Sequence, residues 1–421
     1  MWRKNYSLGI LTLVFMVNTI DRQLIGVVLE PMKKEFNASD TQMGLIAGLW
    51  FAFFYAASSI PIARLADGGN RRNILATCCS LWSFMTILCG ATANYWQLVL
   101  ARMGVAIGEA GCVPASLSMI ADYYPKAQRP LAISLFTGGS YTAALISMVG
   151  GAWIAHEWGW RVTFFSAGTL GVLFALVVWA SVSEPHRGES DISADNVRSP
   201  LLPTLRKILS SAAFRYIMIA NGVASFWIIA VITWNISFLM RSHGLALKHA
   251  GLLTGGLLPL SMITGVLFSG WLCTRMGRRD ARWQLGIPLI GACATMLMSF
   301  AYFLWPAGTE IQFMGKSFPQ ITLPLIGMCF FASWIQAASF AALTNIMPAH
   351  QRSVANATYV IFYTVVGFGL GPVLVGILSD ALTQFSGKEA LRHALAALTP
   401  ILALSMAFYG KSLKPYLEES R

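Results

Sequence analysis

Long apolar runs separated by short polar spacers make up most of this sequence. A helix that crosses the hydrocarbon core of a bilayer needs about 20 predominantly apolar residues. Twelve runs qualify, with approximate bounds 6–29, 43–65, 74–93, 97–121, 130–155, 160–182, 214–240, 246–273, 283–305, 321–347, 353–378 and 391–410. Because these runs are too long for strands and do not alternate, they predict an all-helical membrane protein.

The composition supports this prediction and argues against several other functions. Only 11% of the residues are charged and 56% are hydrophobic, whereas a soluble domain carries about 25% charged residues. The seven cysteines form no CxxC pair, and the six histidines form no HExxH motif, so we expect no disulfide, metal or cofactor site. The first apolar run is too long for a cleavable signal peptide, so we expect it to stay as a span.

The positive charges indicate an orientation rather than a nucleic-acid partner. The net charge is +12, but most Lys and Arg lie in the spacers between spans. With a cytoplasmic N-terminus, 20 of the 30 Lys and Arg fall in cytoplasmic segments and eight in outer segments, while Arg22 and Arg102 lie inside spans. Because Lys and Arg collect on the cytoplasmic side, this bias predicts an inner-membrane protein with both termini in the cytoplasm.

Two motifs repeat in the same order along the chain. "ARLADGGNRRN" (63–73) is matched by "GWLCTRMGRRD" (270–280), and "PKAQR" (125–129) is matched by "PAHQR" (348–352). Parallel six-helix repeats of this kind occur in secondary transporters. We therefore expect an N-terminal half at 1–183, a cytoplasmic linker at 184–212 and a C-terminal half at 213–421.

Over essentially its whole length the chain resembles the major facilitator superfamily. "LADGGNRR" is similar to the loop signature of that superfamily, and "LVLARMGVAIGEAG" (98–111) is similar to its fourth-helix signature. Within the superfamily, the chain resembles the spinster-like lipid transporters. The features that carry this resemblance are Asp21-Arg22, Asn70 before Arg71-Arg72, "GEA" and "IADYYP". The "DR" of the first helix and the "GEAG" of the fourth are also similar to motifs of proton-linked organic-anion symporters. These symporters therefore remain an alternative.

Four charged residues lie deep within the predicted spans: Asp21, Arg22, Arg102 and Glu109. At 1.5 Å of rise per residue, Asp21 and Arg22 lie about 11–12 Å below the outer end of their span, Arg102 about 8 Å and Glu109 about 18 Å. These depths overlap within the reach of the side chains. We therefore predict that Arg22 pairs with Glu109 and that Asp21 lies near Arg102.

Two interpretations of these charges remain open. Charges inside a span are costly and indicate function, so Asp21 and Glu109 are candidate proton carriers, and Arg22 and Arg102 are candidate ion-pair and substrate-binding residues. Protonation of an acid would release its arginine for an anionic substrate group. Alternatively, the four charges form a neutral network that only locks the first helix to the fourth.

Other candidate residues lie in sequence patterns that are less specific for a function. In the second half, polar and aromatic residues on the predicted cavity helices are candidate substrate contacts, although helix packing would explain them as well; they are Trp234, Asn235, Trp334, Gln336, Tyr359 and Tyr363. At the cytoplasmic end, Asp67, Arg71 and Arg72 are candidate gating residues. The two arginines would also be explained if they only set the orientation of the chain in the membrane.

The sequence and the resemblance together predict a transporter and not an enzyme. We expect a monomer that moves protons together with an amphipathic, anionic lipid by alternating access in a lipid bilayer. The alternative is a proton-linked symporter of small organic acids, and sodium coupling stays open. No phosphate-binding GxxxxGK[ST] loop is present in the sequence, which argues against ATP-driven transport.

Overall fold

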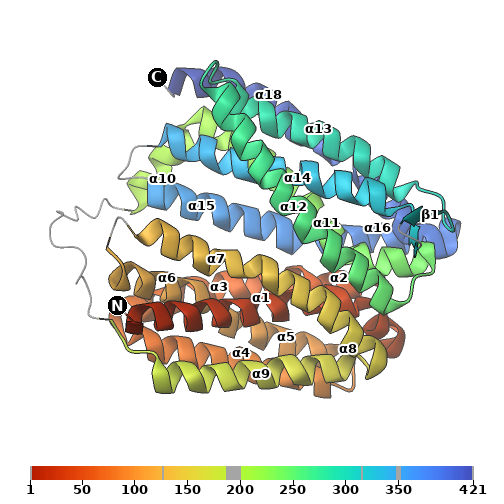
Figure 1. Ribbon diagram of the computed structural model, residues 1–421, viewed down its shortest axis with the longest axis horizontal. Coiled ribbons are helices and arrows are strands. Elements are labelled where there is room, and N and C mark those ends of the chain that lie inside the picture. The colour runs from red at the N-terminus through yellow and green to blue at the C-terminus, as the bar shows by residue number, and fades with distance from the viewer. Residues whose placement is uncertain (1, 126–127, 186–200, 314–315, 348–351, 420–421) are drawn as a thin grey trace. The chain divides into compact units, whose positions relative to one another are not determined.

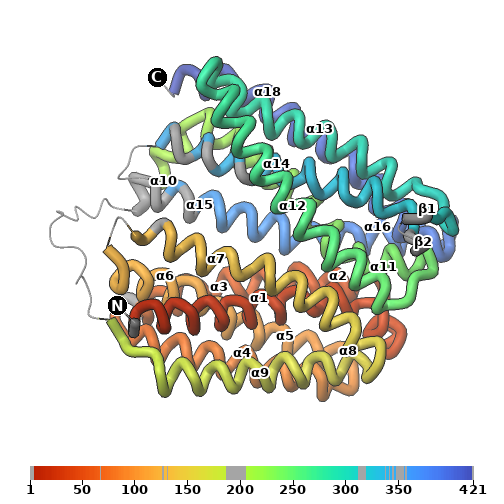
Figure 2. Tube along the Cα trace, viewed as in Figure 1, coloured from red at the N-terminus to blue at the C-terminus, as the bar shows by residue number. Residues whose placement is uncertain are grey.

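The computed structural model describes residues 2–125, 128–185, 201–313, 316–347 and 352–419. The contacts between Cα atoms divide the chain into two units, which are traced in Figures 1 and 2. Unit 1 comprises Met1–Ala38, Leu45–Asn196 and Ala246–Gly255, and unit 2 comprises Ser39–Gly44, Val197–Leu245 and Gly256–Arg421. Each unit is a bundle of helices.

Unit 1 is built mainly from the N-terminal part of the chain. Helix α4 packs against α9 and α5, and α1 packs against α7 and α9. The helices are α1 (Trp2–Phe36), the end of α2 (Asp40–Ala47), α3 (Leu49–Gly68), α4 (Arg71–Ala91), α5 (Tyr95–Glu109), α6 (Cys112–Tyr123), α7 (Arg129–Leu145), the π-helix η1 (Ile146–Gly150), α8 (Gly151–Glu157), α9 (Trp160–Ser181) and the start of α12 (Leu247–Gly277).

Unit 2 is built mainly from the C-terminal part. Helix α13 packs against α14, and α11 packs against α18. The helices are the start of α2, α10 (Leu201–Ser210), α11 (Ala212–His243), α12 from Gly256 onward, α13 (Trp283–Phe303), α14 (Thr322–Ile346), α15 (Arg352–Thr364), the π-helix η2 (Val365–Leu370), α16 (Gly371–Ser386), η3 (Gly387–Glu389), α17 (Ala390–Leu398) and α18 (Ile401–Glu419). Strands β1 (Glu310–Phe313) and β2 (Lys316–Pro319) form an antiparallel hairpin in which Glu310 pairs with Pro319.

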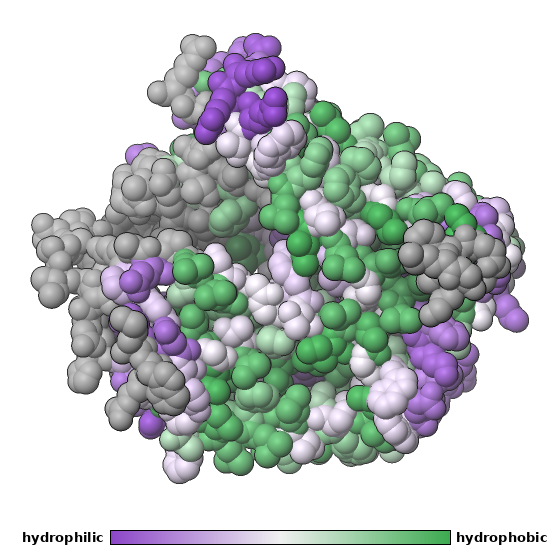
Figure 3. Space-filling model, viewed as in Figure 1, coloured by the Kyte–Doolittle hydropathy of each residue, from purple (hydrophilic) through white to green (hydrophobic). Residues whose placement is uncertain are grey.

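The helices have the length and surface of membrane spans. Among the described residues, 11 segments are long and apolar enough to cross a bilayer, and the last one, Thr358–Glu419, has 62 residues, which is enough for two crossings. Large apolar side chains point outward, such as Leu100, Leu131 and Leu267, which are 67%, 67% and 68% exposed. Figure 3 shows hydrophobic residues over much of one face and hydrophilic residues toward its margins. The predicted all-helical, membrane-spanning architecture is confirmed.

Local sequence signals explain where several helices begin and end. The side chains of Asn70, Asn94 and Ser211 each accept a hydrogen bond from the backbone N–H three residues later, at the starts of α4, α5 and α11. These caps satisfy N–H groups that the first helical turn leaves without a partner. Helix α11 ends at Gly244, whose φ of 66° is the left-handed conformation that glycine adopts at helix ends.

Both units contain a π-helical turn at an equivalent place. In unit 1, η1 connects α7 to α8 and contacts α1, while in unit 2, η2 connects α15 to α16 and contacts α11. A glycine follows each turn and permits close helix approach. A Cβ on Gly151 would lie 2.6 Å from Leu24 Cδ2, and a Cβ on Gly371 would lie 2.6 Å from the backbone oxygen of Phe226. This correspondence agrees with the repeat that the sequence motifs indicate.

A short segment from the N-terminal part of the chain, Ser39–Gly44, belongs to unit 2. Arg241 donates from Nη1 and Nη2 to the two carboxylate oxygens of Asp40, each at 2.8 Å, and the Ser379 hydroxyl donates to the same carboxylate at 2.6 Å. The Asp380 carboxylate accepts from the backbone N–H groups of Asp40 and Thr41 at 2.9 and 2.8 Å. This carboxylate therefore caps the start of α2, where the helix dipole favours negative charge. The sequence analysis did not predict this attachment.

The predicted linker at 184–212 is described only in part. Residues 186–200 lie outside the described residues. Leu201–Ser210 form α10, whose last turn is held by Arg215, since Arg215 Nη1 donates to the backbone oxygens of Leu209 and Ser210 at 2.8 and 3.3 Å. The boundaries of the linker and of the two halves stay predictions.

The close packing at η2 gives a testable prediction. We expect Gly371→Ala to lower the free energy of unfolding by about 1–3 kcal/mol, because the new Cβ would clash with a backbone oxygen that no side-chain rotation can move. Gly150→Ala is the matched control, since nothing lies within 4 Å of its added Cβ. Thermal unfolding in detergent compares the two variants with the unmodified protein. An equal loss of Tm in both variants would contradict the role of close packing at Gly371.

Candidate functional site

The four membrane-embedded charges come together in unit 1. Asp21 and Arg22 lie in the middle of α1, Arg102 lies within α5, and Glu109 is the last residue of α5. The exposed fractions are 2% for Asp21, 1% for Arg102 and 0% for Glu109, whereas the Arg22 side chain is 22% exposed. Arg22 is therefore the member of the set that can reach a group outside the bundle core.

The charges form the two expected pairs, and the pairs differ in tightness. Arg22 donates from Nε at 3.0 Å and from Nη2 at 2.8 Å to Glu109 Oε2. Arg102 Nη1 lies 3.4 Å from Asp21 Oδ1, which is longer than a typical N–H···O hydrogen bond of about 2.7–3.2 Å. Glu109 is thus held by a strong, charge-assisted contact, whereas Asp21 is held more loosely by its arginine.

Two aromatic rings of α3 cover the arginines. Arg22 Cζ lies 5.2 Å from the ring centroid of Phe51 and 4.8 Å from that of Tyr55. Arg102 Cζ also lies 5.2 Å from the Phe51 ring centroid. Cation–π attraction at these distances holds a guanidinium in place without neutralising its charge. Neither ring was predicted from the sequence, although their spacing of four residues in an apolar run places them on one helix face.

The cluster has unused hydrogen-bonding capacity. Glu109 Oε1 and Arg102 Nε are buried, and neither has a hydrogen-bond partner among the described residues. A buried polar atom without a partner costs free energy, so such atoms indicate a place where a ligand or a proton binds. One further contact joins α4 to the site: the Thr86 hydroxyl is hydrogen-bonded to Asp21 Oδ2. Thr86 was not predicted, because a threonine in an apolar run carries no distinguishing signal.

The predicted gating residues at the start of α4 have different surroundings. Arg71 is 2% exposed and bonds to Asp122, to Glu184 Oε1 at 2.7 Å and to Ser118 Oγ at 3.0 Å. It therefore ties α4 to α6 and to the segment after α9 within unit 1. The Arg72 side chain donates to Asn73 Oδ1 at 3.0 and 2.9 Å. The Asp67 side chain lies outside the described part of the chain, and the gating role of the three residues stays a prediction.

The predicted second-half residues mostly make contacts between helices. Trp234 is fully buried and donates from Nε1 to the backbone oxygen of Pro372 at 3.0 Å. The Tyr302 hydroxyl donates to Asn235 Oδ1 at 2.7 Å, which joins α13 to α11. Trp334 is buried in a cluster with Ile287 and Ala338. These contacts are those of helix packing, which was the alternative explanation for this set.

The remaining members of that set are less constrained. Gln336 is exposed, and Tyr363 is partly buried. Tyr359 is only 3% exposed, and its hydroxyl has no hydrogen-bond partner within the residues that the structure describes. A role of any of these residues in substrate binding stays a prediction.

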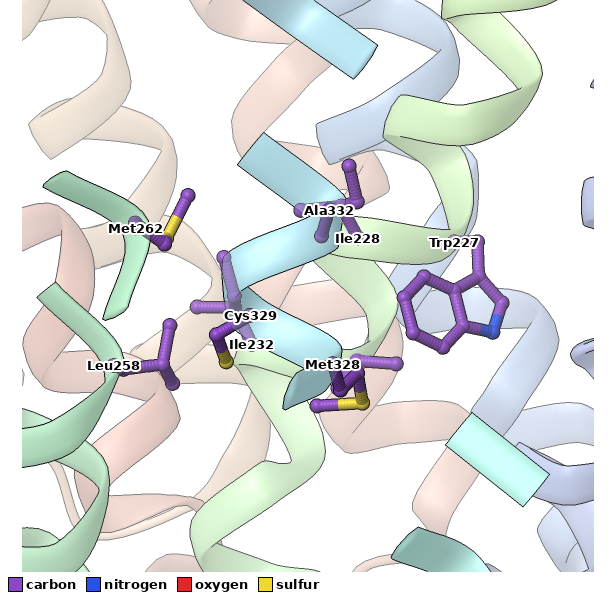
Figure 4. Close-up of a pocket in the computed structure, with 9 residues that line it drawn as sticks. Trp227, Ile228, Ile232, Leu258, Met262, Met328, Cys329 and Ala332 are labelled. Atoms are coloured by element: carbon purple, nitrogen blue, oxygen red, sulfur yellow. The ribbon is translucent and has the colours of Figure 1, made fainter. Parts of the chain in front are cut away.

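Unit 2 also contains a small apolar pocket between α11, α12 and α14 (Figure 4). Its lining side chains are all apolar; they are Trp227, Ile228, Val231, Ile232, Leu258, Met262, Met328, Cys329 and Ala332. The pocket volume is ≈ 20 Å³, so a longer apolar group would fit only if the flexible methionines moved. None of the predicted substrate residues lines this pocket.

Comparison with known proteins identifies the family. Residues 11–372 match the Major Facilitator Superfamily. The chain is 31% identical to an MFS-type efflux pump of Mycolicibacterium smegmatis, over 94% of this chain and 90% of that protein. It is 23% identical to the probable galactarate/D-glucarate transporter GudP of Escherichia coli, over 98% of this chain and 96% of that protein.

A solved structure is similar over the same length. The crystal structure of a bacterial homologue of the human lysosomal transporter Spinster matches with a TM-score of 0.89 and 27% sequence identity, covering 99% of this chain and 98% of that one. The spinster-like resemblance, the twelve-helix fold and the expectation of a transporter rather than an enzyme are confirmed. The chain therefore belongs to the Major Facilitator Superfamily, a family of multi-pass membrane transporters of small molecules, and within it is similar to a bacterial homologue of Spinster.

Proposed function

We propose that this protein is a proton-coupled secondary active transporter of an amphipathic, anionic lipid of the lysolipid or sphingoid-phosphate type. It acts as a monomer in the cytoplasmic membrane, with both termini in the cytoplasm. The observation that carries the proposal is the buried set of two carboxylates and two arginines in unit 1. The lipid element rests on the resemblance to spinster-like lipid transporters.

A purely structural role explains this charge set poorly. Each charge costs free energy to place within a span. Ion pairs inside a protein regain this cost only with good geometry and full hydrogen bonding. Asp21 and Arg102 are 3.4 Å apart, and both Arg102 Nε and Glu109 Oε1 are without partners among the described residues. The charge set therefore lacks the full hydrogen bonding through which a buried ion network stabilises a protein.

Protonation of Asp21 would redistribute the pairs. A neutral Asp21 no longer balances Arg102, whose charge also interacts with Glu109. Arg102 then competes with Arg22 for the Glu109 carboxylate, and Arg22 is released. Because Arg22 is partly exposed and is held by the Phe51 and Tyr55 rings, it stays in position to bind an anionic group of the substrate. Proton uptake and anion binding are coupled in this way.

The substrate needs apolar contacts as well as an anion site. Within unit 1, the rings of Phe51 and Tyr55 lie beside Arg22 and give the anion site apolar neighbours. Such neighbours suit an amphipathic substrate, whereas a sugar acid needs hydroxyl-binding groups around its whole length. This difference favours a lipid.

A second candidate function is proton-linked symport of small organic acids. The similarity to GudP, which is named for galactarate and D-glucarate, favours it. The same four charges would serve such a substrate, because the coupling mechanism needs only an anionic group.

The first prediction concerns the coupling residues. We expect Asp21→Asn and Glu109→Gln each to abolish the dependence of transport on the pH gradient, because the first variant cannot take up a proton and the second removes the carboxylate through which protonation of Asp21 releases Arg22. The measurement is uptake of fluorescent lysophosphatidylglycerol, an anionic lysolipid, into proteoliposomes with and without an imposed gradient. Glu157→Gln is the control, since Glu157 is an exposed carboxylate that contacts Lys248 at 3.5 Å. Transport that still follows the gradient in both site variants would disprove the coupling role.

The second prediction separates the two substrate classes. A ligand at 100 times its Kd stabilises the protein by about 2.7 kcal/mol. We expect lysolipids or sphingoid phosphates to raise the Tm of the purified protein, and we expect Arg22→Gln to remove most of this rise, because the anion site is lost. Stabilisation by galactarate or glucarate, with none by the lipids, would favour the organic-acid symporter instead.

A further inference from the structure

The Thr86 hydroxyl lies between two hydrogen-bond acceptors at the centre of the charge set. Thr86 is 1% exposed on α4, and its Oγ1 contacts Asp21 Oδ2. The same Oγ1 also lies 2.9 Å from the backbone oxygen of Trp82, one turn earlier in the helix. An ionised carboxylate and a carbonyl oxygen both accept hydrogen bonds, and neither donates.

A threonine hydroxyl carries one proton, so it cannot donate to both acceptors at once. When Asp21 is ionised, the hydroxyl donates to the carboxylate, because a bond to a charged acceptor is the stronger one. When Asp21 is protonated, its own O–H donates to Thr86 Oγ1, and the Thr86 proton turns to the Trp82 oxygen. Both states are then fully hydrogen-bonded at this hydroxyl, and the direction of the bonds reports whether Asp21 carries a proton.

The Thr86 hydroxyl lies closer to the Asp21 carboxylate than the Arg102 guanidinium does. The charged and titratable groups that face Asp21 are Arg22 from α1, Cys89 from α4, and Arg102 and Glu109 from α5. Of these, Arg102 Nη1 lies 3.4 Å from Asp21 Oδ1. Glu109 has no comparable hydroxyl among its described contacts, and its Oε2 is held by two bonds from Arg22.

We propose that Thr86 is a positioning residue of the proton-coupling site, and that its hydroxyl switches from Asp21 to the Trp82 carbonyl when Asp21 takes up the proton. The inference rests on the proposed proton coupling and deepens it, because it assigns the carrier role to Asp21 and leaves Glu109 as the counterion of the arginines. No substrate is needed for the switch, so it can be tested separately from transport.

The experiment is an infrared titration of the purified full-length protein in lipid vesicles. The C=O stretch of a protonated, buried carboxylic acid is followed as a function of pH, and Asp21→Asn identifies the band of Asp21. We expect Thr86→Val to move the midpoint of this band about one unit toward higher pH, because the ionised carboxylate loses its hydroxyl donor. Thr86→Ser keeps a hydroxyl, so its midpoint should match that of the unmodified protein.

Thr295→Val is the matched control. Thr295 is fully buried on α13, and its hydroxyl donates to the backbone oxygen of Gly291 at 2.7 Å, as Thr86 does to Trp82, but no carboxylate contact is described for it. If Thr86 only supports its helix, both valine variants lower Tm and both leave the titration unchanged. Thr86→Ala provides a second hydroxyl deletion if the valine variant does not fold.

The possible outcomes are distinct. A shifted midpoint in Thr86→Val or Thr86→Ala, with unshifted Thr86→Ser and Thr295→Val, supports the switch. An unshifted band in the hydroxyl deletions overturns it and leaves the coupling proposal intact. If Asp21→Asn removes no titrating band, the assignment of Asp21 as the carrier is overturned, and the inference falls with it, whatever the lipid transport assay shows.

Discussion

The cost of holding charge inside a membrane-spanning bundle governs this structure. Asp21, Arg102 and Glu109 are almost fully buried, where lipid and packed helices replace the water that would hydrate them. The bundle offsets this cost with two ion pairs, two aromatic rings and one hydroxyl. Removal of any single charge leaves its partner buried and uncompensated, which is the expensive case. A proton added to a carboxylate therefore has consequences beyond that carboxylate, and this is the physical basis of the proposed coupling.

Other buried charged residues in the chain offset the cost of burial in a different way. Arg71 has acidic partners in Asp122 and Glu184 together with neutral acceptors, and Asp40 has Arg241 and Ser379. These two contact sets lie near helix ends and satisfy their charges with several short bonds. They hold helices and segments in place. The central set differs, because its pairs are unequal and two of its polar atoms have no described partner.

Much of this organisation was predictable from the sequence. Membrane helices must be long and apolar, so the runs themselves gave the architecture, and helical rise alone placed Asp21 and Arg22 at the depth of Arg102 and Glu109. Thr86 and Phe51 could not be found in this way, since threonine and phenylalanine are common in spans and only tertiary contacts distinguish them. The attachment of Ser39–Gly44 to unit 2 depends on long-range contacts with Arg241 and Asp380, which no local pattern encodes.

The most direct test of the central claim is the exchange of protons on substrate binding. Lysophosphatidylglycerol, an anionic lysolipid, is added to the purified protein in weakly buffered detergent solution, and the pH change is recorded with a soluble indicator. The account predicts proton uptake when the lipid binds, because an anion replaces a carboxylate as the partner of Arg22, and it predicts no uptake in Asp21→Asn. Saturable lipid binding by the unmodified protein without proton uptake at any pH would contradict the account.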